Sequence, residues 1–329
     1  MSTSVQTKLT LFAENTRAIK KEFSWQNAMT KRLAALLYAL DGKPIDISAI
    51  RSCHETTKSQ TGVFSYFRGN MALCIAAMLA LKPNPQEVFE RTKNTYERLR
   101  SAKFWSGDHL SIAAYQIAAN VPPEKQAEII ARVRDFYEAM KKQHFFMTGS
   151  DDYIFCVMLS LSDVEVAEGT AQIERIYQQL KSEFWTANSV QSLAQILVLG
   201  NSGEEAVQRV IELKTAFRSA GMKLDKMYTT PSLGVLALLP TATDILVRDI
   251  TEAQTFLRGQ KGFGAFSIDT QQLLLCAAAI VASSYAEELK DSVVTVSLAT
   301  SITNIIIAQE AAMIAAISAS TAAASSASS

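Results

Sequence analysis

Four acidic residues follow the connections that open apolar stretches of the chain, and their carboxylates are suited to acid–base chemistry. They are Asp108, Asp151, Asp152 and Asp269. Two neighbouring carboxylates can have their pKa values split, so that one donates a proton while the other accepts one. Acidic residues in a first helical turn also cap or complement the helix start. Both interpretations stay open, although Asp151 and Asp152 are adjacent and a cap needs only one of them.

A second set of polar residues near the starts of the apolar stretches has donors and acceptors for an anionic or sugar-like ligand. The set is Arg68, Asn70, His109, Asn188 and Gln191. The Arg68 guanidinium can bind a carboxylate or phosphate through two hydrogen bonds. It can equally hold a neighbouring connection through carbonyl groups. Helix N-termini gathered at one end would add further donors for an anion.

The sequence indicates neither a metal nor a cofactor. His54, His109 and His144 form no His-x-x-x-His pair, which would place two ligands on one helix face. Gly262 and Gly264 follow Lys261, but the rest of a phosphate-binding loop is missing, and a glycine that ends a helix explains them better. We therefore predict no metal site and no cofactor.

A hydroxyl residue recurs seven times along the chain, at a mean interval of about 40 residues, as in helical-hairpin repeats. The seven are Ser24, Ser65, Ser106, Thr148, Thr186, Thr229 and Ser267. Such a side chain can accept a hydrogen bond from the first turn of a helix, and the preceding residue, which is usually aromatic, can hold the chain against the core. We expect Trp185 to be buried in this way, and Thr148 and Asp151 to form a loose capping box.

A charged amphipathic stretch precedes each of these positions, and a largely apolar stretch follows it. Residues 96–100 are an example of the first kind and residues 190–199 of the second. Apolar residues recur every three to four positions, and no stretch alternates convincingly as a strand would. The predicted fold class is all-α: about seven antiparallel helix-hairpin repeats forming an α/α superhelix or toroid.

The repeat predicts one helical domain over residues 1–317, because each hairpin buries its apolar face only on its neighbours. Residues 292–313 lack Lys and Arg and are rich in Val, Ile and Ala, but residues such as Asn304 and Glu310 are costly in hydrocarbon. We expect a C-terminal packing helix there and no stable membrane insertion. Residues 318–329 are only Ser, Ala and Thr, which predicts a disordered tail.

Charge and cysteine content narrow the partners and the compartment. Lys plus Arg and Asp plus Glu number 32 each, so the basic footprint of a nucleic-acid binder is missing. The four cysteines form no C-x-x-C pair, which favours reduced, buried thiols. Residues 1–15 lack the apolar core of a signal peptide. We predict a cytoplasmic protein with an unknown protein or small-molecule partner and no nucleic acid.

Several strings resemble a known family. They are residues 61–70 (TGVFSYFRGN), 148–155 (TGSDDYIF), 231–240 (PSLGVLALLP) and 260–264 (QKGFG). The chain is similar, up to the predicted tail, to an uncharacterised bacterial family named domain of unknown function 4003. This resemblance implies no activity, ligand or catalytic residue.

Two functional hypotheses follow. The first, which the repeat and the charge balance favour, is a binding or scaffolding protein that uses its concave face or the end where the inner helices begin. The alternative is an enzyme with an acidic pocket at the centre of a toroid, acting on a sugar-like or anionic small molecule. The fold alone defines no reaction.

Overall fold

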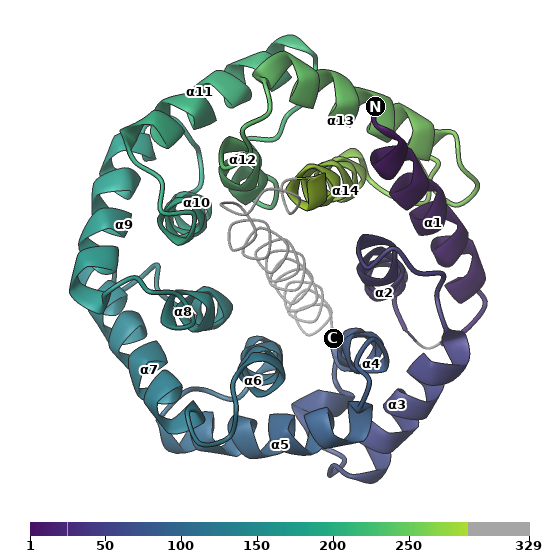
Figure 1. Ribbon diagram of the computed structural model, residues 1–329, viewed down its shortest axis with the longest axis vertical. Helices are drawn as coiled ribbons and strands as arrows, with labels where there is room; N and C mark the ends of the chain where they lie inside the picture. Colours follow the sequence, from purple (N-terminus) through teal and green to yellow (C-terminus); the bar gives the residue numbers. More distant parts are fainter. Residues whose placement is uncertain (25, 289–329) are drawn as a thin grey trace, which may run out of the picture. The chain divides into compact units, whose positions relative to one another are not determined.

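The computed structural model describes residues 1–24 and 26–288, and these residues form α-helices joined by turns and two short 3-10 helices (Figure 1). No strand occurs within them, so the all-α fold class is confirmed for this part of the chain. None of the helices in these ranges is long and apolar enough to cross a membrane. The predicted packing helix at residues 292–313 and the predicted tail at 318–329 lie outside the described residues.

The chain divides into two compact units, which we describe separately. Within the described residues, unit 1 comprises residues 1–17, 39–44 and 164–288, and unit 2 comprises residues 18–38 and 45–163. The single domain over residues 1–317 stays a prediction.

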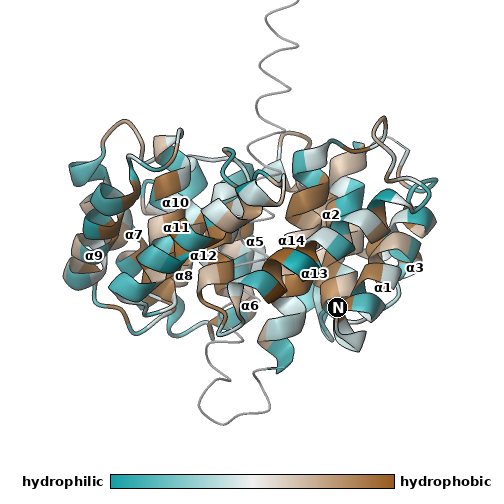
Figure 2. Ribbon diagram, turned by 90° about the horizontal axis from the view of Figure 1, so that it is seen from above, coloured by the Kyte–Doolittle hydropathy of each residue, from teal (hydrophilic) through white to brown (hydrophobic). Residues whose placement is uncertain are grey.

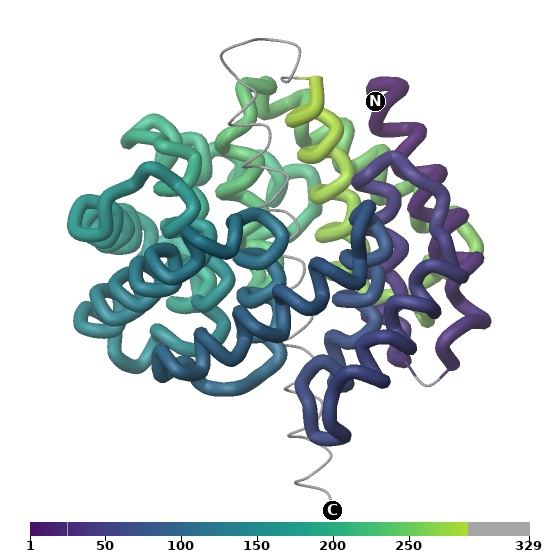
Figure 3. The backbone as a smooth tube through the Cα atoms, turned by 60° about the horizontal axis from the view of Figure 1, so that its bottom comes forward, coloured from purple at the N-terminus to yellow at the C-terminus, as the bar shows by residue number. Residues whose placement is uncertain are grey.

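In unit 2, consecutive helices pack as pairs: α3 on α4, α5 on α6 and α7 on α8. Their bounds are α3 Ile47–Ser59, α4 Ala72–Ala80, α5 Pro85–Ser101, α6 Asp108–Asn120, α7 Gln126–Gln143 and α8 Tyr153–Ser160, with α2 (Ala28–Leu40) before them and the 3-10 helices η1 Tyr66–Arg68 and η2 Ser150–Asp152 in two connections. The even-numbered helices α4, α6 and α8 are seen nearly end-on in Figure 1, whereas α3, α5 and α7 are seen from the side, so the helices of each pair cross at an angle. The connections between them can be followed along the tube in Figure 3. The Tyr115 hydroxyl donates to the Met78 carbonyl over 3.0 Å, which joins α6 to α4.

The helices of each pair differ in composition and therefore in burial. Residues 72–79 of α4 are apolar and all buried, as expected for a helix that neighbours cover on all sides. Helix α5 is amphipathic and buries one stripe, which includes Val88, Phe89, Tyr96 and Leu99. Pro85 at its first turn and Glu87 beside it suit a helix N-terminus.

Unit 1 is built in the same way, with α9 packed on α10, α11 on α12 and α13 on α14. The bounds are α9 Val166–Leu180, α10 Ala187–Leu199, α11 Glu204–Ser219, α12 Thr230–Ala237, α13 Thr243–Arg258 and α14 Thr270–Glu288, together with α1 (Thr3–Ile19). Helix α13 shows polar and apolar turns in alternation (Figure 2). Lys8 joins α1 to α14 by an ion pair with Glu287 (2.7 Å) and a hydrogen bond to Ser283 (2.9 Å).

The recurring hydroxyl residues are not general helix caps, which corrects our expectation. Ser65 does accept from the backbone N–H of Phe67, at 3.3 Å, and so caps η1. Helix α2, however, starts after Asn27, whose side chain accepts from the N–H of Thr30 at 2.8 Å. Thr186 occupies the N-cap position of α10 without a side-chain cap hydrogen bond. Asn and Asp act where we expected Ser or Thr, since their carbonyl oxygens accept such bonds equally well.

Four of the seven residues that precede the recurring hydroxyl residues are exposed aromatic residues, whereas Phe23 is buried, so the expected burial of Trp185 is wrong. Trp185 is 99% exposed, whereas the preceding Phe184 is 9% exposed. Trp105 and Phe104 show the same arrangement, at 77% and 4%. The connection needs one ring to fill the core, and in both cases the first of the two aromatic residues supplies it.

Candidate functional site

The connections that lead from an odd-numbered to an even-numbered helix expose most of the large apolar side chains on the described surface. Nine of the ten that are exposed there lie in these connections, and Leu161 is the exception. The nine are Val63, Phe64, Tyr66, Trp105, Phe145, Phe146, Trp185, Met227 and Phe266. Exposed apolar residues that gather in this way mark interaction sites more often than residues scattered singly.

Hydrogen bonds place neighbouring connections side by side within each unit. In unit 2, the backbone N–H of Trp105 donates to the Tyr153 hydroxyl at 3.2 Å, which joins the α5–α6 connection to the start of α8. In unit 1, the Ser189 hydroxyl donates to the Met227 carbonyl at 2.6 Å, which joins the start of α10 to the α11–α12 connection. Each unit therefore presents its exposed aromatic residues at the end where its even-numbered helices begin.

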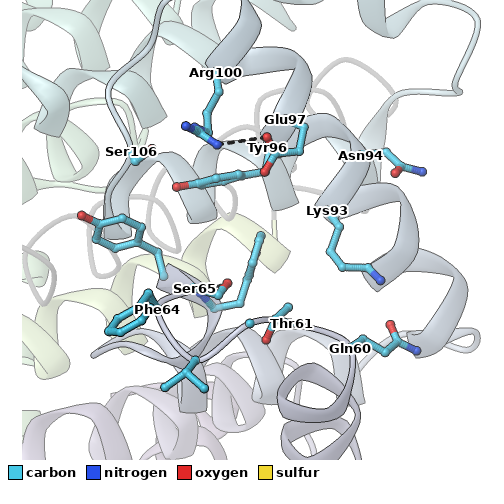
Figure 4. Close-up of a pocket in the computed structure, with 14 residues that line it drawn as sticks. Gln60, Thr61, Phe64, Ser65, Lys93, Asn94, Tyr96, Glu97, Arg100 and Ser106 are labelled. Carbon is cyan, nitrogen blue, oxygen red and sulfur yellow. Dashed lines mark hydrogen bonds and ion pairs between the residues drawn. The ribbon is translucent and has the colours of Figure 1, made fainter.

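A pocket of about 690 Å³ opens at this end of unit 2, between the α3–α4 connection and α5 (Figure 4). Residues 60–67 form one wall and Ser106 adds to the rim. The polar side chains of the α5 wall are Lys93, Asn94, Tyr96, Glu97 and Arg100. The pocket therefore combines exposed rings with cations, amides and hydroxyl groups, which are the groups that bind organic ligands.

The charged groups of the pocket are held on their own helix. Lys93 pairs with Glu90 at 3.0 Å, and Arg100 pairs with Glu97 at 3.2 Å (Figure 4). Arg100 and both acidic partners are exposed and Lys93 is 24% exposed, so solvent weakens both ion pairs and a ligand can compete for the cations. Burial raises the pKa of Tyr96, against hydrogen bonds to Ser106 and Gly107. The phenol is therefore protonated at neutral pH and can donate to an oxygen of the ligand.

The structure brings two of the predicted site residues together in unit 2, at the start of α6. The Asn70 amide donates to Asp108 Oδ2 at 3.5 Å. Burial raises the pKa of Asp108, and the hydrogen bond from Asn70 opposes this. His109 is the next residue of α6 and is half-buried. The predicted catalytic role of Asp108 and the binding roles of Asn70 and His109 stay predictions.

The other acidic candidates lie at helix starts. Asp152 is buried, and its Oδ2 accepts from the N–H of Gly149 at 2.9 Å. Asp152 thus makes the reciprocal contact that we expected from Asp151. In unit 1, Asp269 is exposed and accepts from the N–H groups of Gln271 and Gln272 at 2.8 and 2.9 Å. The capping interpretation explains Asp152 and Asp269, and the catalytic interpretation stays untested.

The remaining candidates are spread over both units. Arg68 donates to the carbonyl of Lys58 and, from Nε, to Thr61 Oγ1 at 3.3 Å, so it holds the end of α3 against the connection. Asn188 is exposed in the first turn of α10, and Gln191 is buried one turn later. None of the nine predicted site residues is among those that line the pocket.

The pocket could have been approached from the sequence only indirectly. Its connection wall is part of the string at residues 61–70, which carries the family resemblance, and Ser65 and Ser106 belong to the recurring hydroxyl residues. Lys93, Asn94 and Glu97 read as the solvated face of an amphipathic helix. No local pattern distinguishes such residues from those that line a pocket.

The described residues include no candidate metal site, and their cysteines are not placed for reactivity. Within residues 1–24 and 26–288, no group of three His, Cys, Asp or Glu side chains is arranged to hold a metal ion. The four cysteines, Cys53, Cys74, Cys156 and Cys276, are free and buried, as predicted. Burial raises the pKa of Cys53 and Cys74, which keeps them as neutral thiols.

Over residues 1–24 and 26–288, these features define an all-helical protein in which each unit exposes aromatic residues where its even-numbered helices begin, and in which unit 2 has a polar pocket. Its sequence matches the family described as protein of unknown function DUF4003 over residues 15–311. The chain belongs to this family, which confirms the resemblance seen in the sequence. No curated protein and no solved structure matches the chain.

Proposed function

We propose that this protein is a helical-repeat binding protein that holds its partner at the end where the even-numbered helices begin. The observation that carries the proposal is the gathering of exposed rings in these connections, including Phe64, Trp105 and Phe146 in unit 2. Large aromatic residues dominate the energetics of protein interfaces, because their burial releases much water at little entropic cost. Rings left in water on the free protein are thus available to a partner.

Two observations support a repeat of helix pairs. The pairs follow one another along the chain, and basic residues lie at matching positions, 28 residues after three of the recurring hydroxyl residues. Stacked helix pairs usually offer extended binding surfaces. We infer that the helix pairs stack in a superhelical repeat and that this stacking forms the interaction surface. Four reduced cysteines favour the cytoplasm as the site of action.

The enzyme hypothesis has less support. Asp152 and Asp269 each accept backbone hydrogen bonds at a helix start, so both carboxylates already have structural partners. The capping contacts account for both side chains without a catalytic role. The binding hypothesis needs no proton transfer.

The proposal can be tested by peptide-display selection on the immobilised full-length protein. We expect enriched peptides whose affinity falls about tenfold or more in the variant Phe64→Ser/Trp105→Ser/Phe146→Ser, because hot-spot residues contribute at least about 2 kcal/mol each. Leu161→Ser is the matched control, since Leu161 is exposed outside these connections. If no peptide is enriched, or if the triple variant binds every peptide as tightly as the wild type, the proposal is wrong.

A further inference from the structure

Three basic residues lie at the same distance from the recurring hydroxyl residues, on three different helices. Lys93 on α5, Arg134 on α7 and Lys214 on α11 are each 28 residues after a hydroxyl residue: Ser65, Ser106 and Thr186, respectively. We call these three residues the docking cations. Lys93 on α5 differs from the other two in the residues that it contacts.

Two of the docking cations hold the preceding connection of their own unit. Lys214 donates to the carbonyl of Glu183 and, at 2.9 Å, to its carboxylate, and the ammonium lies 4.9 Å from the Phe184 ring centroid. Arg134 donates to the carbonyl of Lys103 at 3.2 Å and lies 5.5 Å from the Phe104 ring centroid. Arg134 also donates to the carbonyl of Ala102 at 3.3 Å. In both cases the cation binds a backbone carbonyl of the connection and lies near the ring of its buried aromatic residue.

The third docking cation meets a different connection. The residues that correspond to Glu183 and Phe184 are Gly62 and Val63, so both the carboxylate and the ring are missing. Val63 is 75% exposed, and a Cβ added to Gly62 would meet no atom within 4 Å. Lys93 pairs with Glu90 on its own helix and extends toward Gln60 at the edge of the pocket (Figure 4).

The core beneath the pocket is closed by another ring. Phe67 of η1 is buried, and its centroid lies 5.3 Å from Tyr96 and 5.5 Å from Phe89. Tyr96 corresponds to Tyr137, against which Phe104 packs at 5.7 Å. Since Phe67 supplies the core ring from a position four residues later, residues 60–65 form the wall of an open pocket in front of Lys93.

We propose, on the basis of the binding function above, that this pocket takes an acidic–aromatic peptide segment from a partner. The partner's carboxylate pairs with Lys93, as Glu183 pairs with Lys214, and its aromatic ring packs among Val63, Phe64 and Tyr66. Amide side chains at the rim, Gln60 and Asn94, pair with the peptide groups of the segment. A peptide is the occupant because the two corresponding cations bind peptide segments of this chain.

The test uses fluorescence anisotropy with the full-length protein and a labelled peptide, Ser-Glu-Phe-Trp-Thr, which copies residues 182–186. The control peptide has Gln-Ala in place of Glu-Phe. We expect the first peptide to bind at least tenfold more tightly than the control, and Lys93→Met to remove this preference. Lys214→Met is the matched protein control and leaves the affinity unchanged.

A double substitution in the connection itself should fill the pocket with side chains of this protein. Gly62→Glu/Val63→Phe recreates the missing pair, so the peptide should bind at least tenfold more weakly while the melting temperature stays equal or rises. Equal affinity for both peptides, or unchanged binding by Lys93→Met, would overturn the assignment. If display selection still yields other peptides that depend on Phe64, the binding function stands and only the peptide class is wrong.

Discussion

The ammonium of Lys214 and the carboxylate of Glu183 lie 2.9 Å apart and join α11 to the α9–α10 connection. Only 10% of the Lys214 side chain is exposed, against 39% of Glu183. The same ammonium donates to the Glu183 backbone carbonyl. Lys214 therefore fixes the course of a connection that exposes Trp185 while burying Phe184.

Replacing Lys214 by methionine removes these hydrogen bonds while keeping the length of the side chain. We expect Lys214→Met to lower the free energy of unfolding by about 1 to 3 kcal/mol, the range for hydrogen bonds to charged groups. Glu183→Gln should cost less than about 1 kcal/mol, because its carboxylate is partly solvated and the carbonyl remains. Urea denaturation measures both. Lys93→Met is the control, and an equal loss there would contradict the difference between the contacts of Lys214 and those of Lys93.

The helices could be predicted from the sequence because their residues carry a periodic signal. The amphipathic residues 96–100 lie in α5 and the apolar residues 190–199 lie in α10, as the apolar spacing predicted. The direction of the aromatic pair could not be predicted, since a short connection has no period that assigns Phe184 and Trp185 to opposite sides. The same limit applies to Asp151 and Asp152.

The pocket was harder to predict than the helices. Gly62 and Val63 lack the carboxylate and the ring that Glu183 and Phe184 have at the corresponding positions. Phe67 supplies the core ring instead, which leaves the pocket open. Such a difference becomes visible only when contacts show which residues correspond. The polar candidates read from the sequence, such as Asp269, are mostly explained by local hydrogen bonds at helix starts.

Asp249 on α13 gives unit 1 a pH-dependent contribution to stability. The Tyr285 hydroxyl donates to its Oδ2 at 2.6 Å and Arg248 Nε donates to its Oδ1 at 2.9 Å. Burial alone would raise the pKa of Asp249, but these hydrogen bonds and the amino group of Met1 outweigh burial and lower it. The contribution is therefore complete above the unfolded-state pKa, about 3.9, and is lost as the pH falls through the lower folded-state value.

We accordingly expect Asp249→Asn to destabilise the protein at pH 7 by about 1 to 3 kcal/mol, since charged hydrogen bonds are lost. Urea midpoints measured from pH 7 down to about pH 2 should show a constant difference above the unfolded-state pKa of about 3.9, and the wild type and the variant should converge below it. A difference that stays constant over this range would show that the charge of Asp249 contributes nothing.

Asp108 should behave in the opposite way. Burial raises its pKa, so the folded state binds a proton more tightly than the unfolded chain does. Its contribution to stability is most favourable below the unfolded-state pKa and is lost as the pH rises through the folded-state value. Asp108→Asn should therefore raise the thermal midpoint at pH 7 and make no difference near pH 3. A lower midpoint at pH 7 would instead assign Asp108 a stabilising charge at the start of α6.

Gly234 allows α12 to lie close to α10. A Cβ at this position would lie 2.7 Å from Leu193 Cδ1 and 3.1 Å from Ile196 Cγ2, and both neighbours are fully buried. Overpacking of this kind costs about 1 to 3 kcal/mol, which exceeds the gain of up to about 1 kcal/mol from alanine in a helix. We expect Gly234→Ala to lower the thermal midpoint. Gly264→Ala, which meets no atom within 4 Å, should leave it nearly unchanged.

Phe184 and Trp185 offer the sharpest contrast between a core ring and a ring for a partner. Phe184 is 9% exposed and lies beneath the Lys214 ammonium, so Phe184→Ala should cost about 3 to 5 kcal/mol. Trp185 is 99% exposed, so Trp185→Ala should change stability by less than about 0.5 kcal/mol. Chemical denaturation of the two variants measures this difference. A large loss from Trp185→Ala would mean that the indole packs against the protein, and it would remove Trp185 from the proposed binding surface. A small loss leaves the indole free for a partner, which is the role that its exposure supports.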